Sequence, residues 1–441
     1  MNRELLQRGS RLVSPRRALI LATALVLAAG MFYYYHRVLI PIWRQESATI
    51  DSGTGNWSDL YPRWLGAREL LWHHRNPYSP DVTREIQRGF YGRPLEQTRD
   101  RGPDPEAFAY PVYVVFVLAP SLRFPFDAVR NFYNALMLLL TAASIPLWMR
   151  AFRISLELPA AVLAWIAILS SYPTIDGFHL EQLTLLVAVL ISASVAALAE
   201  GRLALSGILL ALATIKPQLT IFVAAGFLLW TIGDWGSRKW FAIGFGGTMA
   251  AQLIGAELVL PGWFGFWRKA TTEYLGYHRP PLLTSLLGQP AATLAGAAGV
   301  LFCGIKFWRS RGYPPGSGQF NFALVSVLVL TELLVPNAGG GAYYNQLLLL
   351  PAALWLFTTG TKLAKEKAVA RLAWIIAVVM LAGQWVTALI VSCNDLILHH
   401  HFQSDASLFV GAPELLVYEF PVALALFVMS AATRATRLET S

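Results

Sequence analysis

Long apolar runs recur from one end of the chain to the other and constrain its fold more than any other feature. Many are roughly 17 to 22 residues long, enough to cross a hydrocarbon layer of ~30 Å as a helix rising ~1.5 Å per residue. Charged residues make up 14% of the 441 residues, against about 25% in soluble proteins. The sequence therefore predicts an all-α polytopic membrane protein. It excludes a soluble enzyme, a disordered chain and a disulfide scaffold.

Hydropathy predicts about twelve spans in a single membrane domain, residues 1–441. We expect a first transmembrane helix at 18–35, a first extracytoplasmic loop at 36–130, and the remaining transmembrane helices within 131–433. The spans expected after the loop are 131–149, 155–172, 181–199, 203–216, 217–232, 240–260, 287–307, 319–336, 342–359, 372–392 and 412–433.

The net charge of +9 reflects membrane topology rather than binding to nucleic acid. With the N-terminus in the cytoplasm, most Lys and Arg residues outside the long loop fall on the cytoplasmic side, as the positive-inside rule requires. The basic N-terminus runs into 18–35 with no small-residue cleavage site, so we expect an uncleaved first span. The sequence thus predicts a multi-pass membrane protein, surrounded by membrane lipids, with both termini cytoplasmic.

The loop at 36–130 carries the signs of an ordered outer structure. Leu60, Trp64, Ala67 and Leu71 recur at helical spacing, which predicts an amphipathic helix in the headgroup plane. The apolar stretch at 110–120 is bounded by prolines and too short to span, which predicts an interfacial or re-entrant segment. A long ordered loop against the membrane is a common place for chemistry.

Two carboxylates in this loop, Asp51 and Asp59, are candidates for catalysis on the outer side. Asp59 stands directly before the expected helix, with Pro62 in its first turn, so it is also a candidate helix N-cap. Both interpretations are compatible. Tyr61 and Arg63 follow in the same segment and are candidates for a substrate pocket.

Cations at the outer ends of spans are candidates for binding a phosphate. Lys216 stands between two apolar runs, where it either binds an anion or extends to the headgroups. Arg268, His278 and Arg279 lie in an outer loop, against the orientation bias. They either neutralise a phosphate or bind headgroups.

Polar residues that open two spans on the outer side are candidates for the same pocket. His179 and Gln182 flank Glu181 at the start of 181–199. Tyr344 and Asn345 open 342–359, where an aromatic belt is the alternative. The three consecutive histidines at 399–401 cannot all face one ion from a regular element, and the two cysteines have no metal-site spacing, so no metal site is predicted.

Several short motifs of the outer loop occur in a recognisable order. They are Ser58-Asp59-Leu60-Tyr61, Ala67-Arg68-Glu69-Leu70-Leu71, Asn76-Pro77-Tyr78 and Phe108-Ala109-Tyr110-Pro111. This set resembles the first outer loop of glycosyltransferase family 87. Farther along, Glu181-Gln182-Leu183-Thr184 and Ile215-Lys216-Pro217-Gln218 look like that family's Gly-Gln and Lys-Pro segments. The resemblance is closest over residues 50–235.

The resemblance implies a GT-C membrane glycosyltransferase that uses a polyprenyl-phosphate-linked sugar, usually mannose, on the non-cytoplasmic face. By motif position Asp59 is the implied catalytic base, with Asp51 second. The implied partners are the polyprenyl-phosphate sugar and a lipid or glycan acceptor. No cofactor is required, and no ligand cluster demands a divalent metal ion. The sequence departs from the family at Glu181, where glycine is frequent, and at 343–345, where a histidine is common.

The chemistry also follows from the residue types. An inverting single displacement needs a base for the acceptor hydroxyl, here Asp59, and a cation where charge develops on phosphate. Lys216, with Arg268 or Arg279, supplies that cation on the outer side. The alternative is a polytopic lipid or solute transporter or flippase, although the two halves show no convincing repeat. An envelope scaffold is a third interpretation.

Overall fold

The computed structural model describes residues 15–46, 53–96, 105–276, 280–336, 342–365, 367–398 and 408–432. Within these ranges it contains helices and no strand, which confirms the all-α prediction. The elements are α2 (Pro15–Tyr33), the π-helix η1 (Tyr34–Leu39), α3 (Ile40–Glu46), α4 (Leu60–His73), α5 (Pro80–Tyr91), α6 (Val114–Leu118), the 3-10 helix η2 (Ala119–Arg123), α7 (Phe126–Phe152), α8 (Leu158–Leu169), α9 (Tyr172–His179), α10 (Thr184–Ala199), α11 (Leu203–Ala213), α12 (Pro217–Ile232), α13 (Trp235–Val259), α14 (Trp263–Leu275), α15 (Leu282–Leu287), α16 (Gln289–Ser310), α17 (Gly318–Leu334), the 3-10 helix η3 (Tyr343–Leu349), α18 (Leu350–Phe357), α19 (Thr359–Ala364), α20 (Ala368–Leu398) and α21 (Ala412–Ala431).

Six helices among the described residues are long and apolar enough to cross a membrane, so the chain is a multi-pass membrane protein. They are Pro15–Gln45, Phe126–Phe152, Trp235–Val259, Gln289–Ser310, Ala368–Ile397 and Ala412–Ala431. The pair α8 and α9, bent by 49°, makes a seventh if it counts as one span. Each expected span contains a helix, but several are short. For example, the 11 residues of α11 cover only about 17 Å. The total of about twelve spans therefore stays a prediction.

The first helix is longer than expected. It runs without interruption through α2, η1 and α3, eleven residues past the expected end at 35. Tyr34 and Tyr35, in the middle of this helix, are both fully buried. The Tyr35 hydroxyl donates to Asp176 at 2.8 Å, and the Tyr34 hydroxyl donates to a main-chain carbonyl at 2.9 Å.

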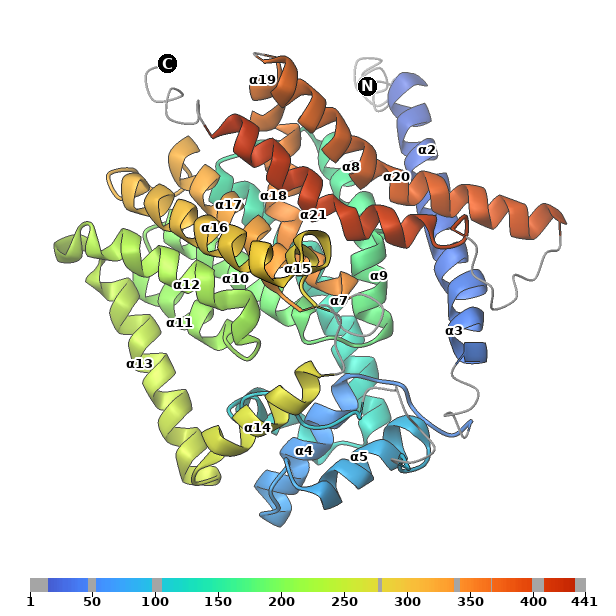
Figure 1. The fold of residues 1–441 in the computed structure, drawn as a ribbon, viewed down its shortest axis with the longest axis vertical. Helices are drawn as coiled ribbons and strands as arrows, with labels where there is room; N and C mark the ends of the chain where they lie inside the picture. The colour runs from blue at the N-terminus through green and yellow to red at the C-terminus, as the bar shows by residue number, and fades with distance from the viewer. Residues whose placement is uncertain are drawn as a thin grey trace, which may run out of the picture.

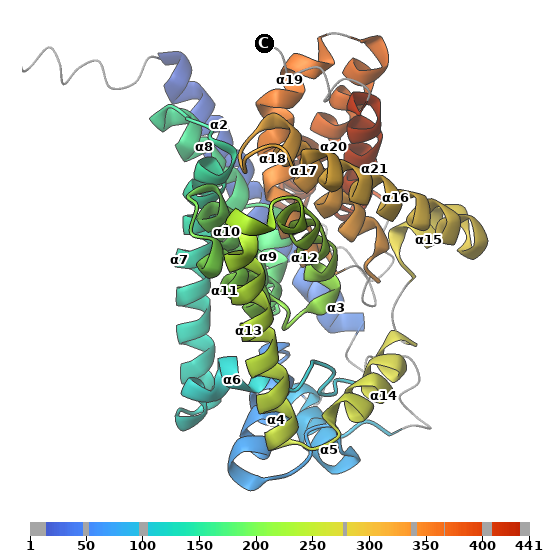
Figure 2. The same cartoon turned by 90° about the vertical axis from the view of Figure 1, so that its left-hand side faces the viewer.

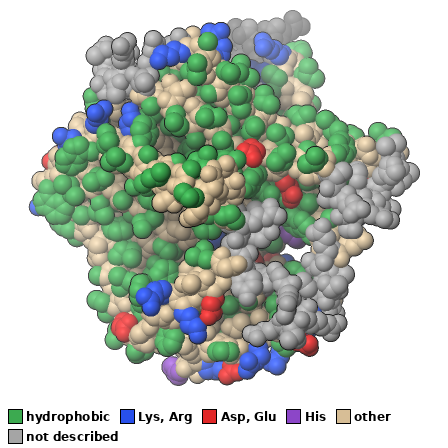
Figure 3. All heavy atoms as spheres, in the orientation of Figure 1, with side chains coloured by type: hydrophobic (Ala, Val, Ile, Leu, Met, Phe, Trp, Pro, Cys, Tyr) green, Lys and Arg blue, Asp and Glu red, His purple; other side chains and the backbone are tan. Residues whose placement is uncertain are grey.

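The molecule has a large helical body and a smaller lower layer. In Figures 1 and 2, α4, α5 and α14 lie together at the lower end, with α6 beside them, while α7 and α13 extend down from the body. Figure 3 shows hydrophobic side chains over most of the body, with charged side chains gathered at the lower end and along the upper edge. The lower layer therefore forms a polar cap over one end of the apolar bundle.

Helix α4 is buried among other helices rather than open on one polar face, whereas its position in the headgroup plane stays a prediction. Leu60, Trp64 and Ala67 are buried as the pattern predicts, but Arg63 and Glu69 are buried too. The reason is that α5, α6 and η2 pack around α4 on several sides. The apolar stretch at 110–120 forms only α6 and the start of η2, so it is too short to span, as expected.

Helices α11 and α13 cross with their backbones in close contact. A Cβ atom on Gly244 would lie 2.2 Å from the carbonyl oxygen of Ala204, and one on Gly207 would lie 2.3 Å from that of Phe241. Small residues at such crossings allow membrane helices to approach closely. This contact fixes α11, which leads directly to Lys216.

Candidate active site

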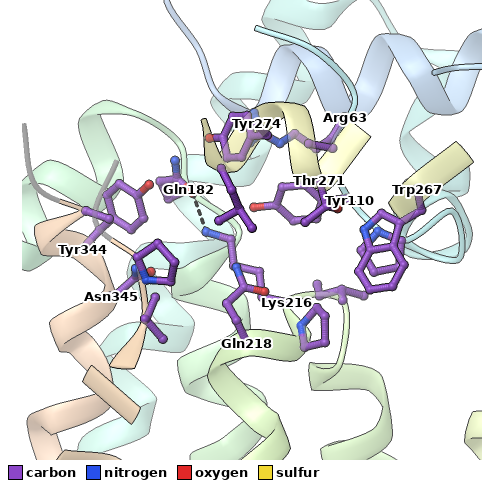
Figure 4. Close-up of a pocket in the computed structure, with 18 residues that line it drawn as sticks. Arg63, Tyr110, Gln182, Lys216, Gln218, Trp267, Thr271, Tyr274, Tyr344 and Asn345 are labelled. Carbon is purple, nitrogen blue, oxygen red and sulfur yellow. Dashed lines mark hydrogen bonds between the residues drawn. The ribbon is translucent and has the colours of Figure 1, made fainter. Parts of the chain in front are cut away.

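A cavity of about 340 Å³ lies between the lower layer and the helical body (Figure 4). This volume is near the lower limit for small-molecule sites, which range over about 300–1,000 Å³. Seven separate stretches of the described chain contribute to its wall. The lining residues are Arg63, Ala109, Tyr110, Pro111, Gln182, Ile215, Lys216, Pro217, Gln218, Trp267, Thr271, Tyr274, Leu275, Val335, Pro336, Ala342, Tyr344 and Asn345.

The charge of this wall has one sign. Among the described lining residues Arg63 and Lys216 are cations, and none is Asp or Glu. Helix α12 also begins at the cavity, with Pro217 and Gln218 in the wall, so its positive N-terminal end lies there. A concave site lined by charges of one sign attracts ligands of the opposite sign. The cavity is therefore suited to an anion.

Lys216 lies in the turn between α11 and α12 and is only 5% exposed. Its Nζ donates to Gln182 Oε1 and to Thr184 Oγ1, each at 2.7 Å. The same atom lies 4.9 Å from the centre of the Tyr344 ring. Figure 4 shows the bond to Gln182 beside the cavity. These contacts favour the anion-binding interpretation over a lysine that extends to the headgroups.

The Gln182 amide joins Lys216 to Asp59. Gln182 is 2% exposed, and its Nε2 donates to Asp59 Oδ2 while its Oε1 accepts from Lys216. Asp59 is not part of the cavity wall itself but lies directly behind this amide. One amide thus separates a carboxylate from an ammonium group that lines the cavity. Such an arrangement can combine proton abstraction with anion binding.

The interpretation of Asp59 as a side-chain cap of α4 is corrected. Asp59 occupies the N-cap position, yet its side chain makes no capping hydrogen bond. Its backbone has φ −66° and ψ −16°, helical values, whereas a capping residue typically takes β-region values that let its side chain reach back to the first turn. The Asp59 N–H instead donates to the carbonyl of Leu180 at 3.0 Å. The side chain is thereby held toward Gln182.

Glu181 explains one departure from the family pattern. Its φ is +54°, in the left-handed region that glycine adopts without strain. The side chain is 1% exposed, and its carboxylate accepts hydrogen bonds from Ser58 Oγ and Arg130 Nε. These contacts join the segment before Asp59 to the segment that carries Gln182. Glu181 thus contributes a connection that glycine cannot make.

The structure brings together most of the expected pocket residues. Arg63, Gln182, Lys216, Tyr344 and Asn345 all line the cavity, although they come from four distant segments. The Thr184 hydroxyl, which also bonds Lys216, donates to Asn345 Oδ1 at 3.1 Å. The polar network therefore continues from Asp59 to η3.

Three expected site residues lie elsewhere. Tyr61 packs against Phe126, with ring centres 4.9 Å apart, because it points from the opposite side of α4. His179 packs against the Tyr35 ring at 5.5 Å and is not part of the cavity wall. Arg268 is exposed, because α14 turns other residues toward the cavity. Asp51, His278 and Arg279 fall outside the described residues.

Sequence reasoning missed the contribution of α14 and the role of Tyr110. Trp267, Thr271 and Tyr274 recur at helical spacing and form the cavity face of α14, a pattern that the sequence already contained. Tyr110 belongs to the motif Phe108-Ala109-Tyr110-Pro111, which by itself indicates no role for the phenol ring. It lies between the two cations in Figure 4, and burial raises the pKa of its phenol to about 12, so it stays neutral.

No three His, Cys, Asp or Glu side chains come together as a metal site in the part of the chain that the structure describes. The histidines at 399–401 fall outside that part.

The family model for glycosyltransferase family 87 matches residues 108–336, more than half of the chain. The matched region includes Tyr110, Gln182 and Lys216, whereas Asp59 and Arg63 precede it. No curated protein and no solved structure matches the chain.

Proposed function

Because the chain belongs to glycosyltransferase family 87, we propose that it transfers a sugar from a polyprenyl-phosphate carrier to a lipid or glycan acceptor. Mannose is the first sugar to test, since the resemblance implies it. The observation that carries the proposal is a cavity with two cations and no described carboxylate in its wall, one amide away from Asp59. The cavity suits the phosphate and sugar of such a donor.

The proposed reaction takes place on the extracytoplasmic face of a bacterial inner membrane. Helix α2 begins and α21 ends at the upper end of the molecule in Figures 1 and 2, opposite the lower layer. Cytoplasmic termini, favoured by the distribution of Lys and Arg, would put the cavity and the lower layer outside.

In the proposed mechanism Asp59 is the general base of a single displacement. Its carboxylate takes the proton of the acceptor hydroxyl as the hydroxyl oxygen attacks the anomeric carbon. The bond from that carbon to the phosphate oxygen breaks, its electron pair leaves with the phosphate, and the configuration inverts. General-base catalysis of this kind contributes about 10²–10⁴ in rate.

Lys216 binds the phosphate in this mechanism and stabilises the negative charge that develops on it. A phosphate leaving group needs no general acid, because it departs as a stable anion. It needs preorganised positive charge instead. The Lys216 side chain, held by Gln182 and Thr184, places such a charge at the cavity wall in this mechanism.

The test uses the purified full chain in lipid nanodiscs with radiolabelled polyprenyl-phosphate mannose and an extract of bacterial membrane lipids. Wild type is compared with Asp59→Asn and with Asp81→Asn, an exposed residue of α5 that pairs with Arg84 on the surface. We expect transfer by wild type and by Asp81→Asn, and a loss of about 100-fold or more in Asp59→Asn.

Full activity of folded Asp59→Asn would exclude Asp59 as the base. Absence of transfer from every polyprenyl-phosphate sugar in a panel would overturn the proposed donor class.

A further inference from the structure

A second buried cation shares the cavity with Lys216. Arg63 is one helical turn after Asp59 on α4, is 4% exposed and lines the cavity. Its guanidinium carbon lies 4.6 Å from the centre of the Tyr110 ring, and Lys216 Nζ lies 5.7 Å from the same centre. One aromatic ring therefore lies within reach of both cations, as Figure 4 shows.

The hydrogen bonds of Arg63 are incomplete. Its Nη1 donates to the main-chain carbonyl of Asp59, but its Nε is buried and has no hydrogen-bond partner among the described residues. Thr271, in the α14 part of the same wall, has a buried hydroxyl that likewise lacks a partner there. Buried polar groups are nearly always hydrogen-bonded, and a buried cation is normally compensated. Both residues belong to the cavity wall, and a phosphate in the cavity would offer strong acceptors to the Arg63 guanidinium.

We propose that Arg63 and Lys216 together hold the phosphate of the lipid-linked donor between them, beside Tyr110, with the Arg63 guanidinium bonded to a phosphate oxygen. This inference rests on the proposed function and assigns the second phosphate-binding cation to Arg63. The sequence had suggested Arg268 or Arg279 for this role, but Arg268 is exposed and does not line the cavity.

The charge on the phosphate explains why a second cation matters. The sugar donor is a phosphodiester with one negative charge, whereas the departing polyprenyl phosphate is a monoester that carries up to two. When the bond from the anomeric carbon breaks, its electron pair moves to the phosphate oxygen. Arg63 therefore binds more strongly as the reaction proceeds, which accelerates the chemical step rather than merely tightening donor binding.

Arg63 also connects phosphate binding to the base. The same guanidinium that faces the cavity donates from Nη1 to the main-chain oxygen of Asp59. Occupation of the phosphate site thus fixes the residue that carries the base. For this reason an Arg63 variant should lower kcat more than it raises KM for the donor.

The experiment measures binding without transfer, on the full-length protein in phosphatidylcholine nanodiscs. The probes are radiolabelled farnesyl phosphate, a monoester, and its methyl ester, a diester. The variants are Arg63→Gln, Arg63→Lys and Lys216→Gln. The control is Arg68→Gln, because Arg68 lies on the same helix, stacks on Trp64 and Trp72 at 5.5 Å each, and is absent from the cavity wall.

We expect wild type and Arg68→Gln to bind the monoester more tightly than the diester. Arg63→Gln should raise the Kd for the monoester about tenfold to a hundredfold and abolish the preference for the monoester over the diester. The Kd of Arg63→Lys should lie between those of wild type and Arg63→Gln. Misfolded protein lowers the number of binding sites but leaves the Kd of the remaining sites unchanged, so the ratio of the two Kd values stays informative.

Each contrary result has its own meaning. If Arg63→Gln binds both probes like wild type while Lys216→Gln does not, the role of Arg63 is refuted and the proposed function stands. If wild type binds neither probe, the role of Arg63 and the proposed donor class are both refuted. If phosphatidylglycerol in the nanodisc displaces farnesyl phosphate through Arg63, the occupant is a bilayer headgroup and the assignment to the donor is overturned.

Discussion

Replacing Gln182 with leucine tests whether the amide between Asp59 and Lys216 positions the base. Leucine is close to glutamine in size, so the substitution removes the hydrogen bonds without opening a large cavity. The loss comprises one bond from Nε2 to the Asp59 carboxylate and one from Lys216 Nζ to Oε1. Lys216 keeps its bond to Thr184 at 2.7 Å, so the phosphate site retains its charge and one anchor.

The magnitude follows from the kind of bond that is lost. A hydrogen bond to a charged group contributes about 1.5–3 kcal/mol net. If the bond to Asp59 serves to hold the base in its reactive orientation, the same energy is lost from the transition state. This corresponds to a decrease in kcat of about 10- to 150-fold. KM for the donor should change less, because Lys216 remains.

The assay is single-turnover transfer of labelled sugar by wild type, Gln182→Leu, Asp59→Asn and the double variant. Gln218→Leu is the matched control, since Gln218 also lines the cavity but is exposed. Once Asp59 is gone, removal of Gln182 should cost little more, which gives a coupling energy of about 1.5 kcal/mol or more. A kcat within threefold of wild type, or additive losses in the double variant, would refute the positioning role.

Three further predictions concern other contacts of the site and fold. Lys216→Met should reduce kcat/KM about 10²- to 10³-fold in the transfer assay, because one preorganised charge is removed; unchanged kinetics would contradict its role. Gly244→Ala should lower the thermal midpoint by an amount equivalent to about 1–3 kcal/mol, since its Cβ would meet backbone at 2.2 Å. Gly247→Ala on the same helix faces open space and should stabilise the protein by up to about 1 kcal/mol. If Gly244→Ala proved more stable than Gly247→Ala, the close contact between α11 and α13 would be disproved. Glu181→Gly relieves about 1–3 kcal/mol of backbone strain but removes a carboxylate that pairs with Arg130, whose side chain is 35% exposed. We expect net destabilisation of about 1–2 kcal/mol. A raised thermal midpoint would show that the strain outweighs the ion pair.

The sequence predicted the helical membrane class and most of the pocket because polar residues in apolar surroundings are informative. Gln182, Lys216 and Tyr344 each stand where an apolar run begins or ends, and the topology places those ends on one side. Because exposing such side chains to hydrocarbon costs free energy, they tend to gather in a shared polar site. The spacing within their own segments sufficed to find them.

What the sequence could not provide was the rotation and depth of individual helices. Arg63 lies off the apolar face that Leu60, Trp64 and Ala67 form on α4, and its burial comes from packing against the chain around Tyr110. His179 and Gln182 lie three residues apart, but only Gln182 reaches the cavity, because the chain turns sharply at Glu181 with φ +54°. Arg268 belongs to a helix whose cavity face is set by Trp267 and its neighbours. These outcomes depend on tertiary packing that a single segment does not encode.

The shared end of the first and last helices has an arithmetic consequence. If the first helix of a chain begins and its last helix ends on the same side of the membrane, the chain must cross the membrane an even number of times. Six full-length helices satisfy this condition, but counting α8 and α9 as one span makes seven. In that case at least one of the shorter apolar helices, such as α10, α12 or α17 with 16, 16 and 17 residues, must complete a passage. With seven spans, parity therefore requires at least one of these short helices to cross, where the layer is thin or where neighbouring helices shield its ends.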